Sequence, residues 1–522
     1  MLFASYEFIG FLLIVLLVYY LLPGKLQWGF LLLASYTFYF LSDPRYLIYI
    51  FITSLSTYLA ARKIQQSKDD LKALPKEERK AHKAAAASVQ KRLFLACLLF
   101  NLGILAVIKY TNFTISNINS LLHTFGSTSE LSFVNLVIPM GISFYTFMAM
   151  GYLIDVKRGT VKAETNFFKF ALFVSFFPQL VQGPISRFGD LSKTLFEPHR
   201  PQYAVITRGL QRILWGYFKK LVIADRIIVA VNAIIHDADT YRGGYVFIGM
   251  MFYALELYCD FTGGIDITIG IAEAMGITVT ENFIRPYFSK NIKEYWNRWH
   301  ITMGSWFTDY IFYPISICQP MLKLSKWSRA KLGNQIGKRV PVYLASFIVW
   351  FTTGIWHGAS WNFIVWGLGN FVVIMISQEL EPFYRWFHGR FQVAGTFPWR
   401  LFQVIRTVLI MSSLRMFDCY RDVPLTFRMF GSMFADFTLS AFTPASFIAL
   451  GLSAWDYAIL AVGLVILVTV SLVQRSGPVR DKIATLNGSY KFIIWYGLFL
   501  AVLIFGTYGI GYEASQFIYN QF

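Results

Sequence analysis

The sequence predicts an all-α polytopic membrane protein, with about 11 transmembrane helices plus re-entrant and interfacial helices around a central cavity. Composition supports this fold class, because 56% of the 522 residues are hydrophobic, 18% are aromatic and only 15% are charged. Soluble domains average about 25% charged residues. Apolar runs recur along the whole chain, and the mean hydropathy is +0.50. These features exclude a disordered chain and an ordinary cytosolic enzyme.

The expected helices follow one another without a hinge-rich linker or an internal repeat, so we expect a single membrane domain over residues 1–522. Several runs are shorter than the roughly 20 residues that span a bilayer upright, and these are expected to be re-entrant or buried between other helices. The first run ends without a cleavage-like site, which indicates a retained membrane helix. The clearest runs are residues 8–22, 28–41, 46–60, 93–108, 136–154, 167–181, 205–235, 245–275, 342–356, 361–376, 401–411, 457–472 and 492–510.

The charge distribution predicts an orientation. The 47 Lys and Arg exceed the 29 Asp and Glu, an excess typical of cytoplasmic loops and of contact with anionic lipid head groups, and no nucleic-acid-binding module is visible. Basic stretches lie at residues 62–92, 323–339 and 475–482. By the positive-inside rule these face the cytoplasm, which places the N-terminus on the extracytoplasmic side. Residues 111–132 hold no Lys or Arg and are expected to form an outside loop.

The most unusual segment is residues 281–314, ENFIRPYFSKNIKEYWNRWHITMGSWFTDYIFYP. From Ile292 onward its apolar residues recur at offsets of 3, 4, 7, 11 and 14, which predicts one face of a helix running through Trp306. A helix rich in Trp with a basic face lies in a membrane interface or lines a wet cavity. His300 is expected at the edge of the apolar stripe, looking into a pocket. The alternative is a helix that serves only as an aromatic anchor.

Residues 353–369, TGIWHGASWNFIVWGLG, hold a second histidine between two apolar runs. An ionisable side chain at bilayer depth is costly, so His357 is a functional candidate. The alternative is a hydrogen-bonded core or interfacial histidine. Gly354, Gly358 and Ala359 are expected to let backbones approach closely.

A third segment, residues 256–270, places Asp260 and Asp266 in an apolar stretch around a Gly-Gly pair. Either carboxylate could orient a histidine or bind a proton, and equally either could cap or pair locally. Other chemistry has no support, since the four cysteines are far apart and H-x-x-x-x-D, G-x-S-x-G, Walker-type and H-E-x-x-H motifs are missing. We therefore expect no metal site.

Taken together, these stretches resemble the membrane-bound O-acyltransferase family, in particular its bacterial alginate and peptidoglycan O-acetylation branch. The resemblance covers residues 1–420 well and is weaker beyond Tyr420. That branch often reads R-R-W-H where this chain has N-R-W-H, so Asn297 departs from the pattern and Arg298 is the arginine expected to be functional. The matching stretches are IPMGISFYTFMAMGYLID (138–155), FPQLVQGPISRFGDL (177–191), residues 260–270, ENFIRPY (281–287), YWNRWHITMGSWFTDY (295–310) and WHGASWNFIVWG (356–367).

The resemblance implies an enzyme of the bacterial cytoplasmic membrane. Such an enzyme moves an acyl group, by default acetyl, from a cytoplasmic thioester to a hydroxyl of an exported glycopolymer or partner protein. The donor would be acetyl-CoA or an acyl carrier, with no bound cofactor, and a separate extracytoplasmic acetyl-transferring protein could take part. The implied catalytic residues are His357 and His300. The implied substrate-binding residues are Asn282, Trp296, Arg298, Trp299, Asp309, Tyr310, Trp356, Trp361 and Asn362.

A neutral histidine with a pKa near 6.5 can take the proton of an acceptor hydroxyl as it attacks the thioester carbonyl. A dry membrane cavity would suppress thioester hydrolysis. The competing reading is a multi-pass transporter or flippase of an acylated carrier, with the two histidines, Asp260 and Asp266 as proton sites. A third reading is a scaffold that recruits a surface enzyme. Labelled acetyl-CoA would separate the first two, because transport needs no thioester cleavage.

Overall fold

Residues 3–508 are described by a computed structural model of the chain. Within them the chain forms helices joined by loops, and the strand-like pairing consists of one isolated bridge between Phe283 and Trp299. The all-α fold class is therefore confirmed for the described residues.

Among the described residues, seven helices are long and apolar enough to cross a membrane. Two shorter apolar segments, Tyr6–Leu21 and Phe167–Gln182, accompany them. A total of about 11 crossings is not confirmed by this count. The seven candidate spans are Tyr46–Ala73, Lys76–Thr124, Gly244–Ala274, Val340–His357, Trp361–Glu379, Ala454–Ser476 and Gly488–Phe505.

The chain divides into two compact units. Unit 1 comprises Met1–Leu210 and Thr268–Thr280, and unit 2 comprises Gln211–Ile267 and Glu281–Phe522. Helices α9 (Tyr203–Tyr217) and α11 (Gly244–Ala274) contribute residues to both. The expectation of a single domain remains a prediction.

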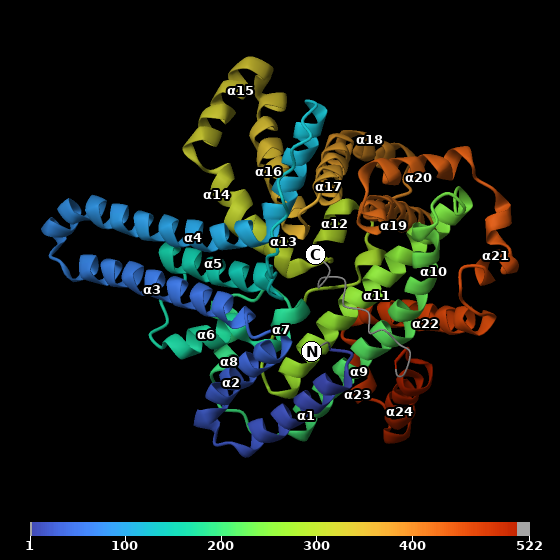
Figure 1. The fold of residues 1–522 in the computed structure, drawn as a ribbon, viewed down its shortest axis with the longest axis horizontal. Coiled ribbons are helices and arrows are strands. Elements are labelled where there is room, and N and C mark those ends of the chain that lie inside the picture. The colour runs from blue at the N-terminus through green and yellow to red at the C-terminus, as the bar shows by residue number, and fades with distance from the viewer. Residues whose placement is uncertain (1–2, 509–522) are drawn as a thin grey trace. The chain divides into compact units, whose positions relative to one another are not determined.

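In unit 1, α3 and α4 form a long hairpin against which α5 packs (Figure 1). The basic stretch 62–92 lies on this hairpin instead of in a loop. Residues 111–124, expected to belong to an outside loop, are the last turns of α4, so that expectation was wrong for them. The helices of unit 1 are α1 (Tyr6–Leu21), α2 (Gly24–Ser42), α3 (Tyr46–Ala73), α4 (Lys76–Thr124), α5 (Ile142–Arg158), α6 (Phe167–Ser175), α7 (Phe177–Gln182) and α8 (Phe188–Leu195).

Unit 2 holds both candidate histidines. Besides parts of α9 and α11, its helices up to the second histidine are η1 (Phe218–Ala224), α10 (Asp225–His236), η2 (Pro286–Phe288), α12 (Ile292–Trp296), α13 (Ile301–Phe307), η3 (Thr308–Phe312), α14 (Tyr313–Ser316), α15 (Gln319–Gly337) and α16 (Val340–His357). The remaining ones are α17 (Trp361–Glu379), α18 (Glu381–Phe391), α19 (Phe397–Tyr420), α20 (Val423–Ala435), η4 (Leu439–Phe442), α21 (Pro444–Ile448), α22 (Ala454–Val473), η5 (Gln474–Ser476), α23 (Val479–Ala484) and α24 (Gly488–Phe505).

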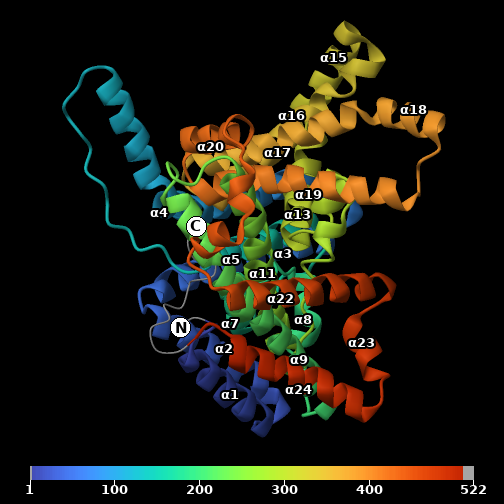
Figure 2. The ribbon, with the colours of Figure 1, turned by 90° about the vertical axis from the view of Figure 1, so that its right-hand side faces the viewer.

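The C-terminal helices of unit 2 pack on η1 and α10. Ser453 and Asp456 form a capping box that starts α22, since each side chain satisfies a backbone N–H of the other residue. Leu460 and Leu467 of α22 belong to an apolar core cluster with Val222 and Ile223 of η1. Figure 2 shows α22 and α24 joined at one end by α23. The short α23 carries part of the basic stretch 475–482.

Candidate functional site

The first histidine lies at a break between two short helices. Helix α12 ends at Trp296, and α13 begins at Ile301, with His300 at a left-handed φ of 48° between them. The N–H of Ile301 donates to the carbonyl of Asn282 over 3.0 Å. The expected continuous helix through Trp306 was therefore wrong, because the backbone at 299–301 leaves the helix to pair with residues 282–284.

The apolar stripe is mostly buried, although it does not follow a single helix axis. Ile292, Tyr295, Trp299, Met303 and Trp306 are buried. Trp296, the sixth member of the stripe, is half-buried.

Asn282 fixes the tautomer of His300. Its Oδ1 accepts from the backbone N–H of Thr302 over 3.1 Å, and a backbone N–H can only donate, so the atom facing Thr302 must be the amide oxygen. The same oxygen lies 3.1 Å from Nδ1 of His300. Nδ1 therefore carries the hydrogen, and in the neutral ring Nε2 carries the lone pair.

The environment keeps His300 neutral. The ring is 1% exposed and lies outside the seven candidate spans. Burial, with a further contribution from the positive charge of Arg415, lowers the pKa of His300 from 6.5 to about 3. At neutral pH this histidine is an acceptor through Nε2 and a poor site for holding a proton.

The second histidine is the last residue of α16. His357 is 4% exposed, and its ring centroid lies 4.5 Å from that of Trp366 and 5.0 Å from that of Trp356. The close helix approach expected at the glycines is confirmed, because a Cβ at Gly354 would lie 2.6 Å from the Phe363 carbonyl oxygen. A Cβ at Gly358 would lie 2.1 Å from the ring of Phe363.

The tertiary structure brings the two histidines together across one aromatic side chain. The Trp356 ring lies 6.1 Å from His300 and 5.0 Å from His357, centroid to centroid. Phe307 of α13 reaches Trp356 at 6.3 Å. Trp356, one of the expected substrate-binding residues, thus lies near both candidate catalytic rings.

Sequence reasoning missed Arg415. This residue of α19 is 4% exposed and forms an ion pair of 2.7 Å with Asp418. Its guanidinium carbon lies 4.8 Å from the ring centroid of Trp366, which contacts His357, and 5.2 Å from that of Trp299, a cation–π arrangement with both rings. An arginine within an apolar helix was the signal that could have identified it.

Two other expected substrate-binding residues have structural partners. Arg298 pairs with Glu294 at 2.6 Å, and its guanidinium donates to the Phe288 carbonyl at 3.4 Å, so it holds the turn before α12. The Asn362 amide is buried and donates to the carbonyl of Phe417 over 3.1 Å.

The remaining expected residues differ in exposure. Trp296 packs on Trp350 at 4.8 Å, whereas Trp361 is 56% exposed. Tyr310 is buried with its ring 5.2 Å from that of Trp306, and Asp309 lies beside it in η3 at intermediate exposure.

Asp260 and Asp266 are counterions of two consecutive lysines. Asp266 accepts from Arg212 at 2.9 Å and from Lys219 at 2.6 Å, and Asp260 accepts from Lys220 at 2.6 Å. The π-helix η1 carries both lysines, and helices of this rare kind often occur at functional sites. Both carboxylates are therefore paired, but with cations of α9 and η1 that lie 40 to 54 positions away in the sequence, and not with local partners.

Comparison with known proteins decides the family. A sequence model of the membrane-bound O-acyltransferase family matches residues 159–329, a range that includes His300 and ends before His357. The chain is 30% identical to the probable alginate O-acetylase AlgI of Azotobacter vinelandii, over 86% of this chain and 82% of that protein. The chain belongs to the membrane-bound O-acyltransferase family.

Other members act on different polymers. The chain is 29% identical to the peptidoglycan O-acetyltransferase of Helicobacter pylori, over 69% of this chain and 66% of that protein. It is also 29% identical to the teichoic acid D-alanyltransferase of Bacillus subtilis, over 48% of this chain and 62% of that protein. The alginate O-acetylase and the peptidoglycan O-acetyltransferase support membership in the bacterial O-acetylation branch of this family.

Proposed function

We propose that the protein transfers an acyl group, by default acetyl, from a cytoplasmic thioester to a hydroxyl of an exported glycopolymer. The donor would be acetyl-CoA or an acyl carrier, and the acceptor a polysaccharide, a cell-wall polymer or a partner protein. The observation that carries the proposal is the pair of buried histidines in contact with Trp356, in a chain whose relatives are alginate and peptidoglycan O-acetylating proteins.

The two histidines would have different roles. His357 would act as the general base: it takes the proton as the acceptor oxygen attacks the thioester carbonyl carbon, the carbon–sulfur bond breaks, and the proton passes to the departing thiolate. His300 would act as a hydrogen-bond acceptor, because Asn282 holds its proton on Nδ1 and leaves the lone pair on Nε2. Its low pKa makes it the weaker candidate for base.

The surroundings favour transfer over hydrolysis. The rings that contact the histidines include Trp356, Trp366 and Phe261, and such walls exclude water that would compete for the thioester. In this proposal the buried Arg415 stabilises the negative charge that develops on the carbonyl oxygen. We further propose that the enzyme lies in the bacterial cytoplasmic membrane with its basic stretches inside and its N-terminus outside.

The test compares His357→Ala and His357→Gln with His82→Ala, a matched change of an exposed histidine in α4. Purified protein receives labelled acetyl-CoA and, in turn, alginate, peptidoglycan and teichoic acid fragments, and thiol release and label transfer are both measured. Loss of a positioned base should lower the rate about 10²–10⁴-fold for both His357 variants. Transfer at the wild-type rate by a folded His357→Ala protein would exclude the base role. Movement of label across vesicles without thiol release would favour the transporter reading.

A further inference from the structure

Unit 2 contains a pocket of about 620 Å³ that the histidine mechanism does not use. Its walls come from α9, η1, α11, the loop at residues 281–285, and the C-terminal elements α22 to α24. Phe283 lies at one edge, with its ring also 6.3 Å from that of His300. The pocket therefore lies next to the histidine site, but most of its walls come from elements that do not carry the two histidines.

The pocket carries an excess of positive charge. Its lining includes four basic side chains and two acidic ones, which leaves a net charge of +2. Arg212 is held by Asp266 and Glu281, at 2.9 and 2.5 Å, and Lys219 is held by Asp266. Arg285 and Arg480 supply the other two positive charges of the lining. The lining basic residues are Arg212, Lys219, Arg285 and Arg480, and the acidic ones are Asp266 and Glu281.

Arg285 is held in an unusual way. Its backbone has a left-handed φ of 52°, a conformation that costs energy for a residue with a side chain. Within residues 3–508 its Nε is buried and finds no hydrogen-bond partner. Burial lowers the pKa of Arg285, and the nearby positive charges of Arg298 and Arg475 lower it further. Three arginines therefore lie close together at this edge of the pocket. An anion placed there would satisfy the buried donor and separate the like charges.

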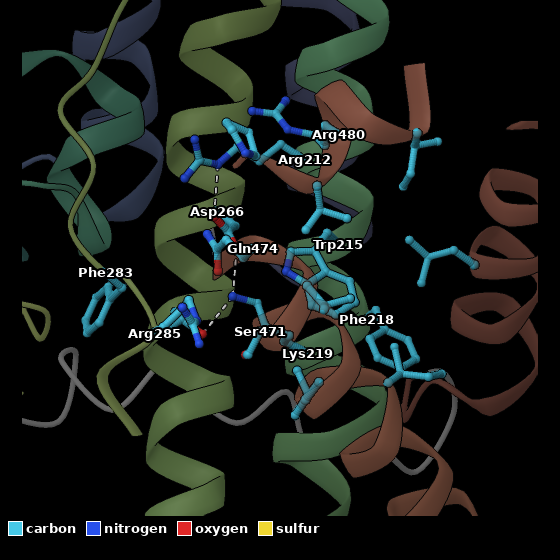
Figure 3. A pocket seen from close by; sticks show the side chains of 18 of the residues that line it. Arg212, Trp215, Phe218, Lys219, Asp266, Phe283, Arg285, Ser471, Gln474 and Arg480 are labelled. Carbon is cyan, nitrogen blue, oxygen red and sulfur yellow. Dashed lines mark hydrogen bonds and ion pairs between the residues drawn. The ribbon is translucent and has the colours of Figure 1, made fainter. Parts of the chain in front are cut away.

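The rest of the pocket is apolar. In Figure 3, Arg212, Asp266 and Gln474 lie together, and Trp215 and Phe218 lie on the other side. Further apolar lining comes from α22 and α24, namely Ile466, Leu467, Val470, Ile494, Trp495, Leu498 and Ala501. These helices are candidate membrane spans, and none of the apolar window of α24 is buried within the protein. Their apolar surface therefore extends from the pocket toward the hydrocarbon of the bilayer.

We infer that this pocket binds an anionic phospholipid, with its phosphate at Arg285 and Arg480 and an acyl chain along α22 and α24. Basic pockets between transmembrane helices on the cytoplasmic side are known to hold acidic lipid head groups. The basic stretch 475–482, which includes Arg480, follows directly after the candidate span α22, and under this inference Arg480 and Arg285 lie at head-group level. A soluble donor such as acetyl-CoA also carries phosphate, but it would leave the long apolar wall uncovered.

Lipid binding is tested on the purified full chain by native mass spectrometry. The protein is titrated with palmitoyl-oleoyl phosphatidylglycerol and, separately, with the matching phosphatidylcholine. Each arginine near an anionic head group adds a factor of about five in affinity, so two should give a preference of about 30-fold for the first bound phosphatidylglycerol. Arg285→Gln with Arg480→Gln should abolish that preference. The matched control, Arg385→Gln with Arg390→Gln on exposed positions of α18, should keep it.

A second variant tests the chain-binding wall. Ala501→Trp places a large ring in the apolar part of the pocket and leaves both arginines in place, so the first tightly bound phosphatidylglycerol should be lost. Equal retention of the two lipids by the wild-type protein, which needs no variant, would overturn the inference. An equal loss of preference in the α18 control would overturn it as well. If acetyl-CoA displaces the lipid, and Arg285→Gln with Arg480→Gln abolishes that displacement, the pocket belongs to the donor instead.

Discussion

Removal of Lys220 provides a direct test of the buried charge network. Its side chain is 1% exposed, and its ammonium group lies 2.8 Å from Asp225 and 2.6 Å from Asp260, whose side chains are 3% and 1% exposed. Lys220→Met would leave these two carboxylates in the interior without their shared cation. Breaking a fully buried ion pair from one side costs about 3–5 kcal/mol, because the remaining charge stays desolvated.

An exposed pair of the same length serves as the control. Arg45 lies 2.6 Å from Asp43, but the arginine side chain is 65% exposed. Surface pairs contribute about 0–1 kcal/mol, so Arg45→Met should change the free energy of unfolding by no more than that. The two ion pairs have the same length and differ in burial, so a larger loss of stability for Lys220→Met than for Arg45→Met is attributed to desolvation of the remaining charges.

The assay is equilibrium unfolding in mixed micelles of dodecyl maltoside and sodium dodecyl sulfate, followed by tryptophan fluorescence. Lys220→Met should lose about 3–5 kcal/mol, and adding Asp260→Asn to it should recover part of that loss. A loss for Lys220→Met no greater than for Arg45→Met would refute the reasoning, since it would mean that water reaches the network.

Three further predictions concern the histidine site. Asn282→Leu removes the acceptor of the Thr302 N–H and of His300 Nδ1, so the free energy of unfolding should fall by about 1–3 kcal/mol for each buried donor, and a loss below 1 kcal/mol in the same titration would contradict this. Gly354→Val should separate α16 from α17 and abolish acyl transfer, whereas Gly497→Ala in α24, where a Cβ meets nothing within 4 Å, should be tolerated; an active Gly354→Val protein would contradict the close approach. Arg415→Gln, made together with Asp418→Asn, removes a cation that lowers the His300 pKa, so that pKa should rise from about 3 toward 6.5 in a nuclear magnetic resonance titration; an unchanged value would mean that burial alone sets it.

The sequence by itself determined the fold class and the family, and it singled out the two histidines as candidates. Apolar runs of near-span length can be read directly, because a bilayer requires consecutive apolar residues whatever the tertiary arrangement. The spacing also grouped Tyr295, Trp299 and Met303 on one apolar stripe, and all three are buried in the structure. His357 and His300 stood out because an ionisable side chain in apolar surroundings costs free energy, which makes it a candidate for a functional role.

Only the tertiary structure decided how these residues meet. The break at His300, its hydrogen bond to Asn282 and the insertion of Arg415 among tryptophans depend on contacts between segments distant in the chain. The pairing of Asp260 and Asp266 with Lys220 and Lys219 likewise required η1 and α11 to pack together. Periodicity within one segment cannot predict such partners, because the energy of a buried charge depends on which opposite charge from another segment the fold places beside it.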